Sequence, residues 1–123
     1  KVLKCIKNNL KFPIHGKGLT KRDFIFDEDF NDAFYKVLKR GKLGKIYHFS
    51  TNYFVSIKNI IEILCKSKNV KYKDFVYNTL DRKGKDKYYF LDCNKTSKEL
   101  KWKPKNKLIQ GLNKTIKYYD KEL

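Results

Sequence analysis

Apolar residues recur at helical spacing in three long stretches of this chain. The stretch over 27–40 has acids in its first turn, which suit a helix N-terminus, and ends on Lys39, Arg40 and Gly41. A second stretch, over 57–65, begins after Ser56, a residue type that caps helices, and a third covers about 107–120. These patterns predict three amphipathic helices. A shorter helix over 94–100, and the tail of another over 1–11, complete the helical prediction.

Short extended runs separate these helices. Residues 12–15 are predicted to be extended, because Pro13 biases the residue before it away from helix, and the Gly-Lys-Gly sequence at 16–18 predicts a turn. Further strands are predicted over 24–26, 46–50, 75–80 and 88–92. The run at 46–50 is apolar on both faces, as in a buried parallel sheet. Helices and strands alternate without a linker or repeat, so we expect one α/β unit.

The 46–50 run is also expected to lie on an apolar surface. Only the helices at 27–40 and 56–66 are available to cover it, so one of its faces should stay exposed to solvent. We expect either Tyr47 and Phe49 or residues 46 and 48 on that face, with Phe30 or Phe34 at its margin.

Length and composition fit one folded domain. The chain has 123 residues, of which 41% are hydrophobic and 15% aromatic, and this excludes disorder. No apolar run approaches the ~20 residues of a membrane span, so no membrane partner is expected. The sequence begins with Lys and contains no Met. We therefore expect it to be processed or to be a piece of a longer protein.

The charge pattern directs attention to arginine. The net charge is +17, which is typical of nucleic-acid-binding proteins, but the lysines are spread along the whole chain, so that class remains the alternative. Of the 30 basic residues only Arg22, Arg40 and Arg82 are arginines, which leaves 30 − 3 = 27 lysines. A guanidinium binds paired phosphate oxygens in a way that lysine cannot reproduce. Arg22 and Arg82 are therefore candidates for anion binding, whereas Arg40 suits a helix C-terminus.

Other chemistry is sparse. Three cysteines without short spacing predict a reduced, cytoplasmic chain without disulfides, and two distant histidines predict no metal site. There is no glycine-rich dinucleotide loop and no phosphate-binding loop, so neither a catalytic residue nor a cofactor-binding residue is predicted within these 123 residues. Tyr35 and Lys39 have the Y-x-x-x-K spacing of a dehydrogenase acid/base pair. We interpret them as a coincidence on the polar side of their helix.

The segment over 81–92 has the most closely spaced candidate functional residues in the sequence. It begins Asp81-Arg82-Lys83-Gly84-Lys85 and leads into the predicted strand at 88–92. Glycine can adopt a positive φ and lets the backbone approach a ligand closely. The segment therefore predicts a turn that faces an anion.

Five segments together resemble the C-terminal portion of the extended short-chain dehydrogenases that act on nucleotide sugars, and they occur in the family's order. They are 12–18, 22–29, 41–48, 81–95 and 100–104, the last containing a W-x-P sequence. Within this NAD-dependent epimerase/dehydratase family, the pattern D-R-x-G-x-D-x-x-Y-x-x-D-x-x-K is most similar to dTDP-glucose 4,6-dehydratases. Its residues here are Asp81, Arg82, Gly84, Asp86, Tyr89, Asp92 and Lys95. The 4-epimerases and nucleotide-sugar decarboxylases share the R-D and W-x-P sequences, so they remain alternatives.

The resemblance implies an α/β substrate-binding lobe, with one or two strands that belong to a parent parallel Rossmann sheet. Residues 1–123 would form the nucleotide-sugar-binding portion, and NAD, the catalytic residues and the Rossmann portion would lie upstream. The whole enzyme, a homodimer active in carbohydrate biosynthesis, would oxidise the sugar at C4, remove water across C5 and C6, and return hydride to C6. This chain alone would be inactive.

The resemblance also implies which residues bind a dTDP- or UDP-linked sugar. The nucleobase site would be lined by Pro13, Ile14 and His15. The diphosphate would be clamped by Arg22 and Arg82, and the nucleotide would be closed over by Asp81 and Lys85. His15 replaces the tyrosine usual in the family, and Lys85 replaces a histidine common in the dehydratases.

Overall fold

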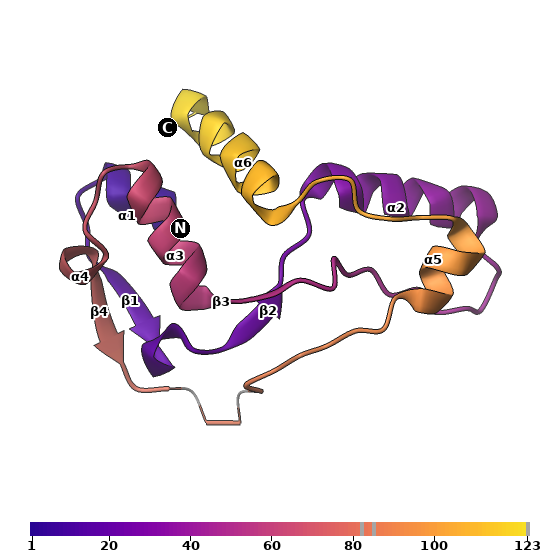
Figure 1. Cartoon of the computed structure of the whole chain (residues 1–123), viewed down its shortest axis with the longest axis horizontal. Helices are drawn as coiled ribbons and strands as arrows, with labels where there is room; N and C mark the ends of the chain where they lie inside the picture. The colour runs from indigo at the N-terminus through magenta and orange to yellow at the C-terminus, as the bar shows by residue number, and fades with distance from the viewer. Residues whose placement is uncertain (82, 85, 123) are drawn as a thin grey trace. The chain divides into compact units, whose positions relative to one another are not determined.

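The computed structural model describes residues 1–81, 83–84 and 86–122. They form two compact units, where the sequence predicted one α/β unit (Figure 1). The first comprises Lys1–Arg22, Val55–Tyr89 and Asn113–Leu123, and the second comprises Asp23–Phe54 and Phe90–Leu112. The reason is that each unit has its own hydrophobic core.

The first unit is built on a parallel strand pair. Strand β1 (Phe12–His15) pairs with β4 (Val76–Thr79), in a register that runs from Phe12↔Val76 to His15↔Thr79. Its helices are α1 (Val2–Lys7), α3 (Ile57–Ser67) and the single turn α4 (Tyr72–Phe75), and a 3-10 turn, η1 (Gly16–Gly18), follows β1. The core of this unit contains Ile14, Ile61, Cys65 and Phe75.

The second unit is mainly helical. Helix α2 (Asp27–Arg40) and helix α5 (Asn94–Leu100) contribute Ala33 and Leu100 to a core that Trp102 completes. The Trp102 ring is fully buried, and its centroid lies 5.2 Å from that of Phe49. The last helix, α6 (Leu108–Glu122), is divided between the units: its residues up to Leu112 belong to the second unit, and those from Asn113 belong to the first.

The predicted helices are confirmed closely. Helix α2 has the predicted bounds, and α5 and α6 differ from prediction by two residues at most. Ser56 caps α3, since its hydroxyl accepts a hydrogen bond from the backbone N–H of Asn59 at 3.1 Å. Of the predicted helical tail over 1–11, only Val2–Lys7 is helical.

The strand predictions are confirmed less well. The 12–15 strand is present as β1, and the 75–80 strand is present as β4. Residues 24–26 were predicted as a strand but form none; the strand present just before them is β2 (Lys21–Asp23), which pairs with β3 (Phe54–Ser56). Residues 46–50 and 88–92 form no regular strand, so these two predictions were wrong.

Around residues 48–52, backbone N–H groups donate hydrogen bonds to side chains instead of to a neighbouring strand. The His48 N–H donates to the hydroxyl of Thr96 at 3.1 Å, and the Thr51 N–H donates to the Asp23 carboxylate at 2.6 Å. Backbone donors that bond to side chains are not available to a neighbouring strand. The apolar run at 46–50 is therefore an extended segment without strand pairing.

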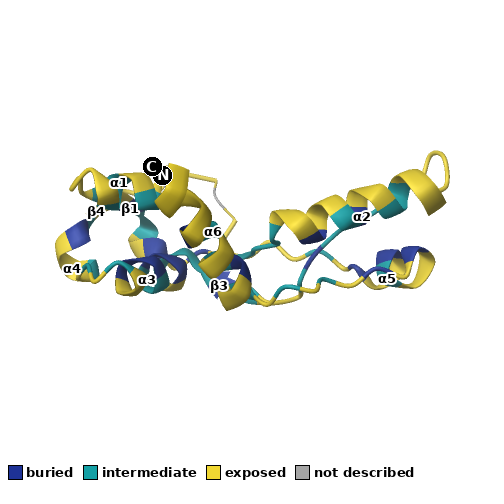
Figure 2. Cartoon of the chain, turned by 90° about the horizontal axis from the view of Figure 1, so that it is seen from above, coloured by how far each residue is buried: buried dark blue, intermediate teal, exposed yellow. Residues whose placement is uncertain are grey.

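Exposure along this segment alternates from residue to residue. Ile46 is 73% exposed, and His48 is also exposed, whereas Tyr47 and Phe49 pack against the second unit's core. Phe30 and Phe34 on α2 are 47% and 55% exposed. Most of the length of α2 is coloured as exposed in Figure 2. Ile46 and His48 are therefore the exposed pair of the two alternatives, while the extent of the apolar surface stays a prediction.

Candidate functional site

The candidate site lies where strands β1 and β4 end. Because the two strands are parallel and in register, His15 and Thr79 are opposite one another at the carboxyl edge of the pair. Ligands of α/β proteins bind beyond this edge of a parallel sheet. The predicted residues His15 and Asp81 are both brought here, although 66 positions separate them in sequence.

Gly16 allows the two chain segments to approach closely. Its φ is +55°, a conformation that L side chains rarely adopt, and a Cβ atom at this position would overlap the Asp81 carboxylate. The turn after β1 and the turn after β4 therefore meet at a glycine. This contact places a carboxylate directly over the backbone of residue 16.

His15 is held by two oxygen atoms of β4 and the residue after it. Its Nδ1 lies 2.8 Å from the Thr79 hydroxyl and 3.0 Å from the Leu80 carbonyl oxygen. The Thr79 hydroxyl in turn donates to the Ile14 carbonyl at 3.3 Å. The imidazole is half-buried and therefore has a defined orientation at the strand end.

Arg22 connects β2 to the segment that follows residue 85. Its Nη1 donates to the Lys21 carbonyl at 2.7 Å and its Nη2 donates to the Asp86 carbonyl at 2.9 Å. The Lys21 N–H also donates to the Lys87 carbonyl at 3.1 Å. A guanidinium has five N–H donors, so within the described residues three remain for another acceptor.

The other predicted site residues differ in accessibility. Pro13 is exposed on β1, whereas Ile14 is 2% exposed and packs in the first unit's core. The Ile14 side chain is thus directed away from solvent. Arg82 and Lys85 lie outside the described residues.

Two carboxylates that the sequence did not single out prove to be structural centres. The Asp23 carboxylate accepts hydrogen bonds from the Ser50 and Thr51 hydroxyls and from the Thr51 and Asn52 N–H groups. Asp29 was interpreted only as a first-turn acid of α2, yet it is 2% exposed and its carboxylate accepts hydrogen bonds from the Lys105 and Asn106 N–H groups, just after the W-x-P sequence. The role of Asp23 could have been suspected from the cluster of short polar residues at 50–52, because such side chains commonly form hydrogen bonds in turns.

Burial raises the pKa of the Cys65 thiol, with a smaller contribution from the nearby Glu62 carboxylate. Burial also raises the pKa of Cys93, where the Ser50 hydrogen bond opposes the shift and the Asp23 and Asp92 charges add to it. All three cysteines are free thiols in the structure. Within the described residues no three His, Cys, Asp or Glu side chains are grouped to hold a metal, and no helix is long and apolar enough to cross a membrane.

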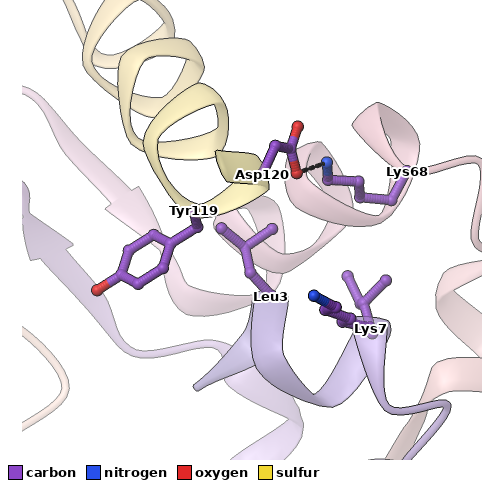
Figure 3. Close-up of a pocket in the computed structure, with 6 residues that line it drawn as sticks. Leu3, Lys7, Lys68, Tyr119 and Asp120 are labelled. Carbon is purple, nitrogen blue, oxygen red and sulfur yellow. Dashed lines mark hydrogen bonds and ion pairs between the residues drawn. The ribbon is translucent and has the colours of Figure 1, made fainter. Parts of the chain in front are cut away.

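Two further features are separate from the strand ends. Tyr35 is 58% exposed, and the Lys39 ammonium lies 5.6 Å from its ring centroid, which agrees with a surface pair. A pocket of about 240 Å³ lies between α1, α6 and the end of α3 (Figure 3). Lys68 and Asp120 form an ion pair at its rim. Its lining contains none of the predicted site residues that the structure describes.

Comparison with known proteins gives a consistent result. Residues 1–115 match the family model described as GDP-mannose 4,6 dehydratase. A dTDP-glucose 4,6-dehydratase from Haemophilus influenzae is 35% identical over 117 residues, which cover 87% of this chain. That match is 35% of the length of the relative, so this chain spans about a third of it.

Two solved structures resemble the chain closely. The dTDP-glucose 4,6-dehydratase DesIV of Streptomyces venezuelae, solved with NAD bound, superposes with a TM-score of 0.91 at 27% identity, over 98% of this chain and 37% of its own. A UDP-glucose 4-epimerase from Thermotoga maritima, solved with UDP-glucose, has a TM-score of 0.88 at 22% identity, over 98% of this chain and 38% of its own. The second likeness shows the fold alone. The chain is therefore a mixed α/β structure that matches part of these enzymes.

Proposed function

The chain belongs to the GDP-mannose 4,6 dehydratase family, with dTDP-glucose 4,6-dehydratases among its relatives, and from this we propose that it is the nucleotide-sugar-binding part of an NAD-dependent 4,6-dehydratase. The substrate would be a sugar linked to dTDP or UDP. A dehydratase is favoured because the 35% identity is to a dTDP-glucose 4,6-dehydratase. A 4-epimerase is the second candidate, since a UDP-glucose 4-epimerase has the same fold.

The observation that carries this proposal is the meeting of two predicted site segments at one strand edge. Gly16 lies against the Asp81 carboxylate, and the Arg22 guanidinium bonds to the backbone at Asp86. The segment between these two anchors contains Arg82. Arg22, one of the two arginines that the sequence selected for anion binding, is thus hydrogen-bonded to the segment that follows β4.

These residues would bind and orient the substrate rather than carry out the chemistry. The free N–H donors of Arg22 would hold diphosphate oxygens with charge-assisted hydrogen bonds, which are among the strong ones in proteins. Holding the diphosphate positions the sugar for reaction elsewhere in the enzyme. The 123 residues contain no glycine-rich dinucleotide loop and so do not fit NAD, and we assign NAD binding to the part of the relatives beyond the matched region. The homodimer stays a prediction.

Isothermal titration calorimetry with dTDP tests the proposal. Arg22→Lys should weaken dTDP binding about tenfold or more, because charge-assisted hydrogen bonds contribute roughly 1.5–3 kcal/mol each. Arg40→Lys is the matched control, since Arg40 is an exposed residue in the last turn of α2. We expect it to leave the affinity unchanged.

Three outcomes would contradict this assignment. Absence of dTDP binding would refute the nucleotide site, and equal affinities of the wild type and Arg22→Lys would refute the role of Arg22. Binding to DNA that weakens steeply with salt, without a preference for dTDP, would support a nucleic-acid-binding module instead. We also expect no NAD binding and no conversion of dTDP-glucose by the 123-residue chain.

A further inference from the structure

The hydrogen bonds around His15 determine which of its ring nitrogens carries the proton. The Leu80 carbonyl oxygen is only an acceptor, and it lies 3.0 Å from His15 Nδ1. An unprotonated Nδ1 would place a lone pair against that oxygen, whereas a protonated Nδ1 donates to it. The favourable neutral tautomer is therefore the one with the proton on Nδ1.

Thr79 supports the same tautomer. Its hydroxyl lies 2.8 Å from His15 Nδ1 and also 3.3 Å from the Ile14 carbonyl, which can only accept. If the hydroxyl donates its single proton to Ile14, it can only accept from Nδ1. Both oxygens around Nδ1 thus act as acceptors, and the Nε2 of a neutral ring is left with a lone pair.

We propose that His15, held as the Nδ1–H tautomer by Leu80 and by Thr79 as a positioning residue, uses Nε2 to accept a hydrogen bond from a ring N–H of the substrate's base. Thymine and uracil have such a ring N–H at N3, whereas cytosine has a lone pair there. The site then selects imide bases. This inference rests on the proposed function and adds a specific atom and a specific donor to it.

Two features of the site support this role. His15 is at the carboxyl end of β1, next to the Gly16 turn over which Asp81 lies. Within the described residues Nε2 makes no hydrogen bond, while Nδ1 has two oxygen neighbours. Nδ1 therefore fixes the orientation of the ring through its hydrogen bonds, and Nε2 is available to a ligand.

Long-range ¹H–¹⁵N NMR of histidine-labelled chain tests the tautomer without a ligand. His15 should show the Nδ1–H pattern, and exposed His48, the second histidine, serves as the internal reference. Thr79→Val should shift His15 toward a mixture of tautomers, and Thr79→Ser should restore the wild-type pattern. An Nε2–H tautomer in the wild type would overturn the proposal. A spectrum unchanged in Thr79→Val would overturn the role of Thr79.

Ligand binding tests the acceptor. Wild-type chain should bind UDP about five- to tenfold more tightly than N3-methyl-UDP, as expected for loss of one hydrogen bond. His15→Phe, which keeps a ring but removes the acceptor, should bind the two nucleotides equally, whereas a purely steric effect of the methyl group would persist. Equal wild-type affinities, with UDP bound, would overturn this inference and leave the proposed function standing. Failure of UDP and dTDP to bind would overturn both.

Discussion

Replacing Asp29 with asparagine should strongly destabilise the second unit. The two Asp29 carboxylate oxygens accept hydrogen bonds from the Lys105 and Asn106 N–H groups, both at 2.9 Å, and the side chain is 2% exposed. In Asp29→Asn one oxygen becomes an NH₂ group, which is a donor and faces another donor. The variant thus loses charge assistance at one bond and leaves one N–H without an acceptor.

The size of the effect follows from these two bonds. Hydrogen bonds to charged groups contribute roughly 1.5–3 kcal/mol each, and an unsatisfied buried donor costs about 1–3 kcal/mol. We expect Asp29→Asn to lower the free energy of unfolding by about 2–4 kcal/mol. Small proteins have only about 5–15 kcal/mol in total, so the loss is a large fraction.

Urea denaturation followed by tryptophan fluorescence is the suitable assay. Trp102 is the chain's one tryptophan, is fully buried, and donates from Nε1 to the Asp29 carbonyl at 3.2 Å, so its emission reports on this unit directly. Asp27→Asn is the control, because Asp27 is an exposed first-turn acid of the same helix. It should change stability by no more than about 0.5 kcal/mol. An Asp29→Asn variant as stable as the control, with unshifted emission, would refute the reasoning.

Two further predictions concern the α2 surface and the cysteines. Phe30, Phe34 and Leu38 form an exposed stripe at helical spacing, so Phe34→Ser should reduce binding of a hydrophobic dye, while Tyr35→Ser, outside the stripe, should not. At pH 8, iodoacetamide should modify half-buried Cys5 before Cys65 and Cys93, as followed by mass spectrometry, because burial both shields these two thiols and raises their pKa. A raised pKa keeps these thiols protonated in the folded chain while unfolded thiols ionise near pH 8.5, so the free energy of unfolding should fall as pH rises from about 8 to 10. Equal rates at all three cysteines, or a rise in stability over that range, would contradict this.

The local patterns of the sequence were sufficient for the helices. The bounds of α2 were predicted to the residue, because its apolar periodicity, first-turn acids and final Gly41 are all encoded within one short segment. Ser56 was identified as the cap of α3 for the same reason. The family was also accessible from the sequence, since its short motifs occur in the expected order and the comparisons confirm it.

Contacts between distant residues decided the rest. The 46–50 run has the composition of a buried strand, but Asp23 and Thr96 bind the backbone donors around it, and neither partner can be inferred from the run itself. Arg22 and Asp81 were selected from the sequence, yet Gly16 beneath Asp81 and Thr79 beside His15 were not. Periodicity records which face of a segment is buried, whereas a hydrogen-bond partner some 65 positions away depends on how two strands come into register.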